Sequence, residues 1–399
     1  MPKNFILLWT SQILSQVTIQ IMNFLLLARI YQTTQSAIAT SLLWVSYALP
    51  TIFFGPIGAG VVDMVSRRKT LMITNLLQSL IIFLYIFTHN YSVFLLFVVV
   101  VIYSFLNQFY VPAEMAALPS VVSQKHLPKA NSLFFLTQQL SLIFGFGLAG
   151  LIEKLLTFKG TLIFCSILLF IAFLSVFFLP KLKPRNKTPQ NIENLIKKLF
   201  DNILEGYRYI KGNRTILFPL GLLFIIQVSL SIVTANLPSI AQEIFHVSIS
   251  YAGVLVVVPA GIGAAIGSYL VHKLISKKWR KKKIIDISLF ILALSTILLL
   301  FGSLIFGPIA IIFIGLGFVG INIPTLTFLQ ENTPDSLRGR VFGNLWFFIT
   351  VASIFPLIFS GAITEFLGVK TLLTMMSVGV ILILAYSRTH GQKLVEEVL

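Results

Sequence analysis

Twelve long apolar segments, each able to cross a lipid bilayer as a helix, follow one another along this chain of 399 residues. A membrane-spanning helix needs about 20 mostly apolar residues. Hydrophobic residues make up 57% of the chain and charged residues only 11%, against about 25% charged in a soluble domain. We therefore predict an all-α membrane protein with twelve transmembrane helices, at residues 5–31, 38–62, 70–88, 93–118, 130–152, 160–179, 215–240, 250–275, 284–303, 305–330, 341–364 and 370–387.

The positions of the basic residues predict the orientation of these spans. The net charge of +17 could indicate nucleic-acid binding, but the lysines and arginines gather in short clusters between the apolar runs, as they do in membrane proteins. With a cytoplasmic N-terminus, 26 of the 30 basic residues fall on the cytoplasmic side, and only Arg29, Lys154, Lys159 and Lys370 do not. We expect a multi-pass protein of the cell (plasma or inner) membrane with both termini cytoplasmic and no nucleic-acid partner.

A long polar segment near the middle divides the spans into two sets of six. Thr188 and Pro189 are a cap and a first-turn proline, and apolar residues such as Leu195 and Leu199 then recur every four positions. This pattern indicates an amphipathic helix on the inner membrane surface, with a plain solvated linker helix as the alternative. We expect an N-terminal six-helix bundle at 1–180, a cytoplasmic linker at 181–214 and a C-terminal six-helix bundle at 215–399.

The loop after the second span combines small residues with charges. Gly58 and Gly60 would let that helix approach a neighbour closely, and Asp63 stands at its end, where a negative charge opposes the helix dipole. Arg67 and Arg68 follow directly. Topology alone explains the arginines but neither the glycines nor Asp63, so we interpret the group as a latch that controls the inner gate.

This loop resembles the signature loop of the major facilitator superfamily, Gly-x-Leu-Ala-Asp-Arg-x-Gly-Arg-Arg/Lys. The chain keeps Asp63, Arg67 and Arg68, and its glycines Gly58 and Gly60 lie one residue away from the family position. The resemblance covers the whole chain in span number, linker position and loop charge. It implies a secondary transporter that works by alternating access, is monomeric, has no cofactor or metal and is not an enzyme. The loop departs from the family pattern at Ala59, Met64 and Ser66.

Further segments resemble the bacterial drug-efflux subgroup that includes macrolide efflux proteins and enterobactin exporters, namely 4–15, 109–113 and 329–343. This resemblance implies multidrug efflux or antiport of a small amphiphilic compound that is drug-like, macrolide-like or siderophore-like. Lysophospholipid transporters of the same superfamily share Pro112–Ala113 and Lys129–Asn131 and are the alternative. A membrane-embedded enzyme or sensor is more remote, because the chain has no cluster of His, Asp or Cys and no added soluble domain.

Polar residues inside the spans are expensive and should face the interior of the protein, where a transporter binds its cargo. Gln12, Gln16 and Gln20, continued by Asn23, form one stripe along the first span. The alternative for any one of them is an interhelical hydrogen bond without cargo contact. The other cavity-lining candidates are Asn107, Gln108, Gln138, Gln227, Ser231 and Asn322.

Ionisable residues are scarce within the spans. Glu114, two residues after Pro112 in the fourth span, is the candidate for a proton site. The fourth-span arginine of many proton-coupled drug exporters is absent, so the sequence supports transport better than it supports proton antiport, and protons remain one alternative as the coupling ion. In the fifth and eighth spans, Gly145 and Gly263 predict close helix packing.

Overall fold

A computed structural model describes residues 2–180 and 214–389 of the chain. The described residues form helices joined by short turns and contain no strand. The amphipathic helix predicted for the central linker falls within 181–213, outside the described residues. By internal packing the chain divides into two units, one made of residues 1–35 and 43–199 and the other of residues 36–42 and 200–399.

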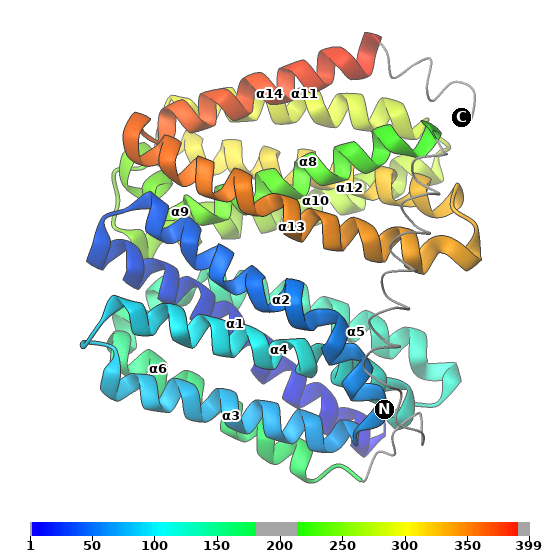
Figure 1. Cartoon of the computed structure of the whole chain (residues 1–399). Coiled ribbons are helices and arrows are strands. Elements are labelled where there is room, and N and C mark those ends of the chain that lie inside the picture. Colours follow the sequence, from blue (N-terminus) through cyan, green and yellow to red (C-terminus); the bar gives the residue numbers. More distant parts are fainter. Residues whose placement is uncertain (1, 181–213, 390–399) are drawn as a thin grey trace. The chain divides into compact units, whose positions relative to one another are not determined.

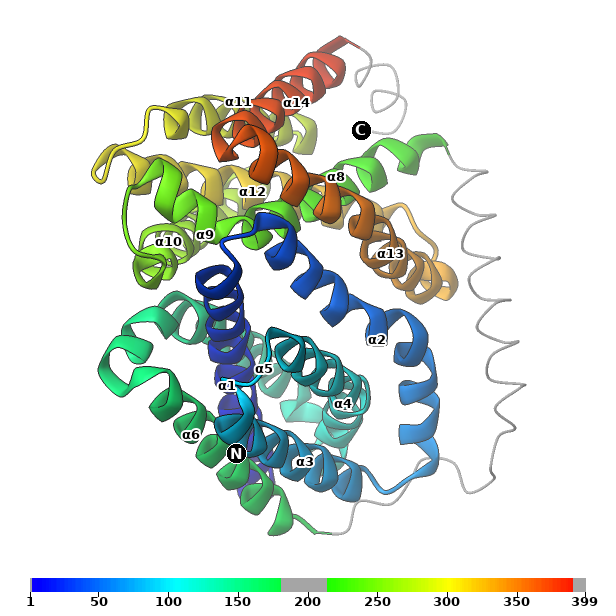
Figure 2. The ribbon, with the colours of Figure 1, turned by 60° about the vertical axis from the view of Figure 1, so that its left-hand side comes forward.

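The first unit is a bundle in which α6 packs against both α1 and α3, and α3 also packs against α4 (Figures 1 and 2). Ser92 begins α4 as its cap, with the side chain accepting a hydrogen bond from the backbone N–H of Phe94 at 3.1 Å. The elements of this unit are α1 (Lys3–Thr34), α2 (Ala37–Met64, from residue 43 on), α3 (Arg67–Thr88), α4 (Val93–Val121), η1 (Gln124–His126), α5 (Leu127–Ser141), η2 (Leu142–Gly147) and α6 (Ala149–Phe177).

The fifth span is broken, whereas the sequence predicted one continuous helix. The α5 helix ends at Ser141, a π-helical turn follows, and α6 then continues past a kink at Thr157, where φ is 64°. For this reason eleven helices of the described residues, and not twelve, are long and apolar enough to cross a membrane unaided. The break coincides with a close approach, because a Cβ at Gly145 would lie 2.7 Å from the Cβ of Gln20 on α1.

In the second unit α12 is central and packs against α8, α10 and α11, while α14 packs against α11 and α13 (Figure 1). Its long helices are α8 (Arg214–Ala235), α10 (Val258–Ser276), α11 (Lys281–Leu300), α12 (Phe306–Glu331), α13 (Asp335–Leu367) and α14 (Val369–Thr389). Short helical turns connect α8 to α10, namely α9 (Leu237–Ser239), η3 (Ile240–Ile244), η4 (Ile249–Tyr251) and η5 (Gly253–Val257).

Glycine allows the closest helix crossing in each unit. In the first unit a Cβ at Gly58 of α2 would lie 2.3 Å from the carbonyl oxygen of Gln108 on α4. In the second unit a Cβ at Gly263 of α10 would lie 1.8 Å from the carbonyl oxygen of Ile312 on α12. No side chain fits at these distances, so the prediction of close packing at Gly263 is confirmed, and the same explanation holds for Gly58.

Candidate substrate-binding residues and signature loop

The glutamines of α1 have two different environments. Gln12 is buried, and its Nε2 donates to the backbone carbonyl of Phe134 on α5 at 3.2 Å. Gln16, Gln20 and Asn23 are partly exposed, and their side-chain amides have no hydrogen-bond partner among the residues that the structure describes. The first residue of the stripe therefore holds two helices together, and the next three keep their amides available.

Asn23 also lines a small pocket of the first unit. Its neighbours in the pocket include Leu26, Trp44, Tyr47 and Val100. One amide of the stripe thus lies among aromatic and aliphatic side chains.

On α4 the two candidate amides hold α2. Asn107 Nδ2 donates to the hydroxyl of Tyr47 at 3.3 Å, and Gln108 Nε2 donates to Thr51 Oγ1 at 3.0 Å. Gln108 also donates to the Ser104 carbonyl at 3.0 Å. These bonds lie beside the Gly58 crossing, so the amides stabilise the α2–α4 contact whether or not they reach cargo.

The candidates in the second unit divide in the same way. Ser231 Oγ donates to the Gln227 carbonyl one turn earlier in α8, at 3.1 Å. The side-chain amides of Gln227 and of Asn322 on α12 are partly exposed, and neither has a partner within the described part of the chain. Gln138, on α5 of the first unit, is exposed.

Glu114 is buried in the first unit, with 3% of its surface exposed. Its Oε1 accepts a hydrogen bond from the Tyr110 hydroxyl at 2.7 Å, one turn earlier on α4. Ser11 and Ser15 of α1 interact with the same hydroxyl, and Asn75 of α3 donates to Ser11 at 3.1 Å. The carboxyl group is thus connected, through Tyr110, to a chain of neutral hydroxyl and amide groups, and no ion pair to it occurs among the described residues.

The arginines of the signature loop reach the ends of two other helices. Arg67, mostly buried at the start of α3, donates to Ser120 Oγ at 2.8 Å near the end of α4. Arg68 donates to the carbonyls of Val176 and Phe177 at the end of α6, and its guanidinium lies over the Phe177 ring at 5.6 Å. Cations are favourable at helix C-termini. Gly60 and the side chain of Asp63 lie outside the described residues, so the latch role of Asp63 stays a prediction.

The second unit repeats this arrangement with other residues. Lys281 and Lys282 begin α11 as Arg67 and Arg68 begin α3, and Lys281 pairs with Glu331 at the end of α12. Lys282 donates to the Ser387 carbonyl at 2.8 Å near the end of α14.

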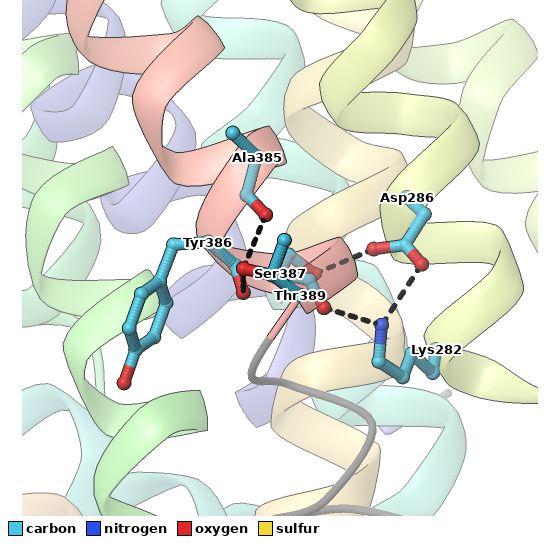
Figure 3. A network of polar contacts seen from close by, with 6 residues as sticks. All are labelled: Lys282, Asp286, Ala385, Tyr386, Ser387 and Thr389. Carbon is cyan, nitrogen blue, oxygen red and sulfur yellow. Dashed lines mark hydrogen bonds and ion pairs between the residues drawn. The ribbon is translucent and has the colours of Figure 1, made fainter.

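Asp286 completes this network on α11. It pairs with Lys282 at 2.9 Å and accepts from the Ser387 hydroxyl at 2.5 Å (Figure 3). Sequence reasoning named neither lysine as a site residue. The signal that could have found them is the shared position of two basic residues at the start of the third helix of each half.

Eleven helices of the described residues are long and apolar enough to cross a membrane, and the third helix of each unit begins with two basic residues that reach the ends of neighbouring helices. This architecture is that of a multi-pass α-helical membrane protein. The chain belongs to the major facilitator superfamily, whose family model, described as Major Facilitator Superfamily, matches residues 8–357. It is therefore a secondary transporter of this superfamily and not an enzyme.

Relatives with curated sequences support the family but not a cargo. The chain is 23% identical over 406 residues to the uncharacterized MFS-type transporter YfmI of Bacillus subtilis (strain 168), covering 96% of this chain and 95% of YfmI. It is 25% identical over 357 residues to the uncharacterized MFS-type transporter YfiS of the same organism, covering 85% of this chain and 81% of YfiS.

Solved structures support the fold. The nucleoside transporter NupG superposes with a TM-score of 0.71 at 17% identity, covering 95% of this chain and 97% of NupG. A POT family transporter in complex with 5-aminolevulinic acid superposes with a TM-score of 0.74 at 12% identity, covering 99% and 97% of the two chains. The predicted major facilitator fold is confirmed, and these identities are too low to carry a substrate over.

Proposed function

We propose that this transporter exports a small, uncharged or amphiphilic compound, either drug-like, macrolide-like or siderophore-like, by alternating access. The observation that carries the proposal is the group of unpaired, partly exposed amides on α1, made of Gln16, Gln20 and Asn23. Gln227 and Asn322 add two more in the second unit.

An unpaired amide within a membrane span is costly, so it needs a partner at some stage of function. Each amide offers both donors and an acceptor, which suits hydroxyl, carbonyl and amide groups of a cargo. Gln12 is the contrast, because its Nε2, one turn earlier, already donates to the Phe134 carbonyl, and only its buried Oε1 is left without a partner among the described residues. Neutral amides next to aromatic side chains give no counter-charge for a strongly ionic cargo.

We propose Glu114 as the site of proton coupling. Its neighbours are neutral, so gain or loss of one proton changes the net charge of this buried region by a full unit, and a buried charge is costly. Glu114→Gln removes the titrating group and keeps the shape, and we expect it to abolish any dependence of transport on a pH gradient. Tyr110→Phe is the matched control, because it removes the hydrogen bond and leaves the carboxyl group, and it should keep that dependence.

We further propose that both termini are cytoplasmic, that the transporter works as a monomer in the cell (plasma or inner) membrane, and that residues 181–214 connect its two bundles. In this orientation the signature loop, Gly58, Gly60, Asp63, Arg67 and Arg68, lies at the cytoplasmic gate. Asp63→Asn should slow transport while the protein still reaches the membrane. Normal transport by this variant would remove Asp63 from the gate.

The decisive experiment measures transport in inverted membrane vesicles, with and without an imposed pH gradient. The panel contains a macrolide, a cationic dye, a catecholate siderophore and a lysophospholipid. Accumulation of a drug-like compound that falls at least about tenfold in a combined Gln16→Ala and Gln20→Ala variant supports the proposal, since two lost hydrogen bonds of about 1 kcal/mol each predict this size. Movement of the lysophospholipid alone, with no effect of the gradient, would instead establish a lipid transporter.

A further inference from the structure

The turn between α10 and α11 carries a dense positive charge. Seven of the eleven residues from 273 to 283 are Lys or Arg, and none is acidic. Lys281 and Lys282 are engaged by Glu331 and Asp286. Lys277, Lys278 and Arg280 are exposed and make no ion pair within the described part of the chain. The charge of these three residues is therefore available to a partner outside the protein.

This turn has a defined backbone. The N–H of Trp279 donates to the Leu274 carbonyl at 3.1 Å, and the N–H of Lys278 donates to the Ile275 carbonyl at 2.9 Å. This pair of bonds ends α10 with a Schellman motif, and Lys278 takes the left-handed conformation with a φ of 59°. Glycine is the usual residue there, because a side chain in this conformation is strained. The turn thus has a lysine, next to other basic residues, at a position whose backbone conformation is fixed and unfavourable for a side chain.

An aromatic side chain and an apolar pocket adjoin the charges. Trp279 is 39% exposed, and the Lys283 ammonium lies 4.8 Å from the centre of its ring. Tryptophan is enriched where a span meets the membrane surface. Lys281 and Lys282 also line a pocket with walls that are otherwise mostly apolar, including Phe218, Leu222, Ile285 and Phe328.

We propose that the α10–α11 turn binds the headgroups of anionic phospholipids at the membrane surface. Cations at the end of two spans, an interfacial tryptophan and adjacent apolar surface complement a molecule with a phosphate head and acyl tails. The equivalent turn of the first unit has less free charge, because Arg67 and Arg68 are turned to the ends of α4 and α6 and Lys69 is the one basic residue left beside them. The proposal stands independently of the cargo.

Trp279 provides the measurement. The full chain is reconstituted in phosphatidylcholine bilayers that contain increasing brominated phosphatidylglycerol or, separately, brominated phosphatidylcholine. The quenching of Trp279 is obtained by subtracting the signal of Trp279→Phe. For each brominated lipid we determine the mole fraction that gives half-maximal quenching of Trp279. We expect the ratio of this mole fraction for phosphatidylcholine to that for phosphatidylglycerol to be at least about five, the effect of one or more basic residues near an anionic surface. Addition of about 0.5 M NaCl, roughly three times the physiological ionic strength, should reduce this ratio because salt screens exposed charges.

The variant Lys277→Gln, Lys278→Gln, Arg280→Gln tests the turn while keeping Trp279. Its ratio should fall towards one, since three of the exposed cations of the turn are removed and only Lys273 and Lys283 remain exposed there. The matched control, Lys129→Gln, Lys159→Gln, Lys370→Gln, removes the same charge at three exposed sites elsewhere and should keep the wild-type ratio. Equal quenching by both lipids in the wild type, or an unchanged ratio in a turn variant that elutes and melts like the wild type, would overturn the proposal.

Discussion

The helices α3 and α11 both begin with two basic residues that contact the ends of other helices, but the groups that these residues contact differ. In each bundle two successive basic residues begin the third helix, and they reach the ends of the fourth and sixth helices. The first bundle uses Arg67 and Arg68, which contact a hydroxyl and backbone carbonyls. The second uses Lys281 and Lys282, whose ammonium groups contact carboxylates as well.

The difference follows from the shape of the two cations. A guanidinium donates through a planar fork and can contact two adjacent carbonyls and an aromatic ring together, as Arg68 does, whereas an ammonium is a compact point charge. The second bundle accordingly supplies Asp286 four residues after Lys282, where the first bundle has Met72 four residues after Arg68. The common element is the placement of cations at helix C-termini, and the acid is an addition of the second bundle.

The largest effect should come from the helix crossings that the two bundles share. Gly263→Ala places a methyl group 1.8 Å from the Ile312 carbonyl oxygen, so the α10 and α12 backbones must separate. We expect a loss of at least about 3 kcal/mol in stability, at the upper end of the usual cost of overpacking. Gly58→Ala should act similarly in the first bundle. Thermal unfolding of the detergent-solubilised protein measures both.

Gly379→Ala is the matched control for these crossings. Position 379 lies in α14 of the second bundle, and a Cβ there would meet no heavy atom within 4 Å. Alanine is favoured over glycine in a helix by up to about 1 kcal/mol, so this variant should be as stable as the wild type or slightly more stable. If Gly263→Ala and Gly379→Ala melted alike, the steric explanation of the crossings would be wrong.

The spans and the glycine crossings could be predicted because both depend on local signals. Long apolar runs locate helices in a membrane, and small residues within them indicate close packing. The break in the fifth span was missed because an apolar run looks the same whether its helix is regular or contains a π-turn. The turn at η2 depends on how Gly145 packs against Gln20, and this contact joins residues that are far apart in sequence.

The candidate site could be predicted only as a set of residue types. Gln12 and Gln16 have the same chemistry and lie one turn apart, yet only Gln12 finds a backbone partner, the Phe134 carbonyl on α5. Which amide stays unpaired is decided by the tertiary position of α5. The Lys281–Glu331 pair likewise joins residues on two different helices, so no local pattern indicates it.

A medium effect should follow when the acid of the second bundle is removed. Asp286→Ala leaves Lys282, with only 15% of its side chain exposed, without its carboxylate, and Ser387 loses its acceptor. Hydrogen bonds to charged groups contribute about 1.5–3 kcal/mol, so we expect a loss of about 2 kcal/mol in thermal unfolding.

The double variant Asp286→Ala, Lys282→Met sharpens the comparison with the first bundle, because it removes both charges together. It should recover part of the stability lost in Asp286→Ala, since the main cost is an unpaired, partly buried cation. The double variant could instead be less stable than Asp286→Ala, by the cost of losing the hydrogen bond from Lys282 to the Ser387 carbonyl. That result would mean that Lys282 acts mainly through this carbonyl. The second bundle would then depend on the same helix-end contact as the first.

The smallest effect should come from the outer cation of the second bundle. Lys281 is as little exposed as Lys282, at 15% of its side chain, but its partner Glu331 is 56% exposed, so the carboxylate left behind when Lys281 is removed stays in contact with water. Lys281→Gln should therefore change stability by less than about 1 kcal/mol, as is usual where water screens an ion pair. Arg67→Gln at the corresponding position should cost more, because Arg67 is mostly buried and donates to Ser120 on α4. Equal losses of stability in the two variants would show that Arg67 and Lys281 stabilise their bundles to the same extent. The difference between the bundles would then lie only in Arg68 and Lys282.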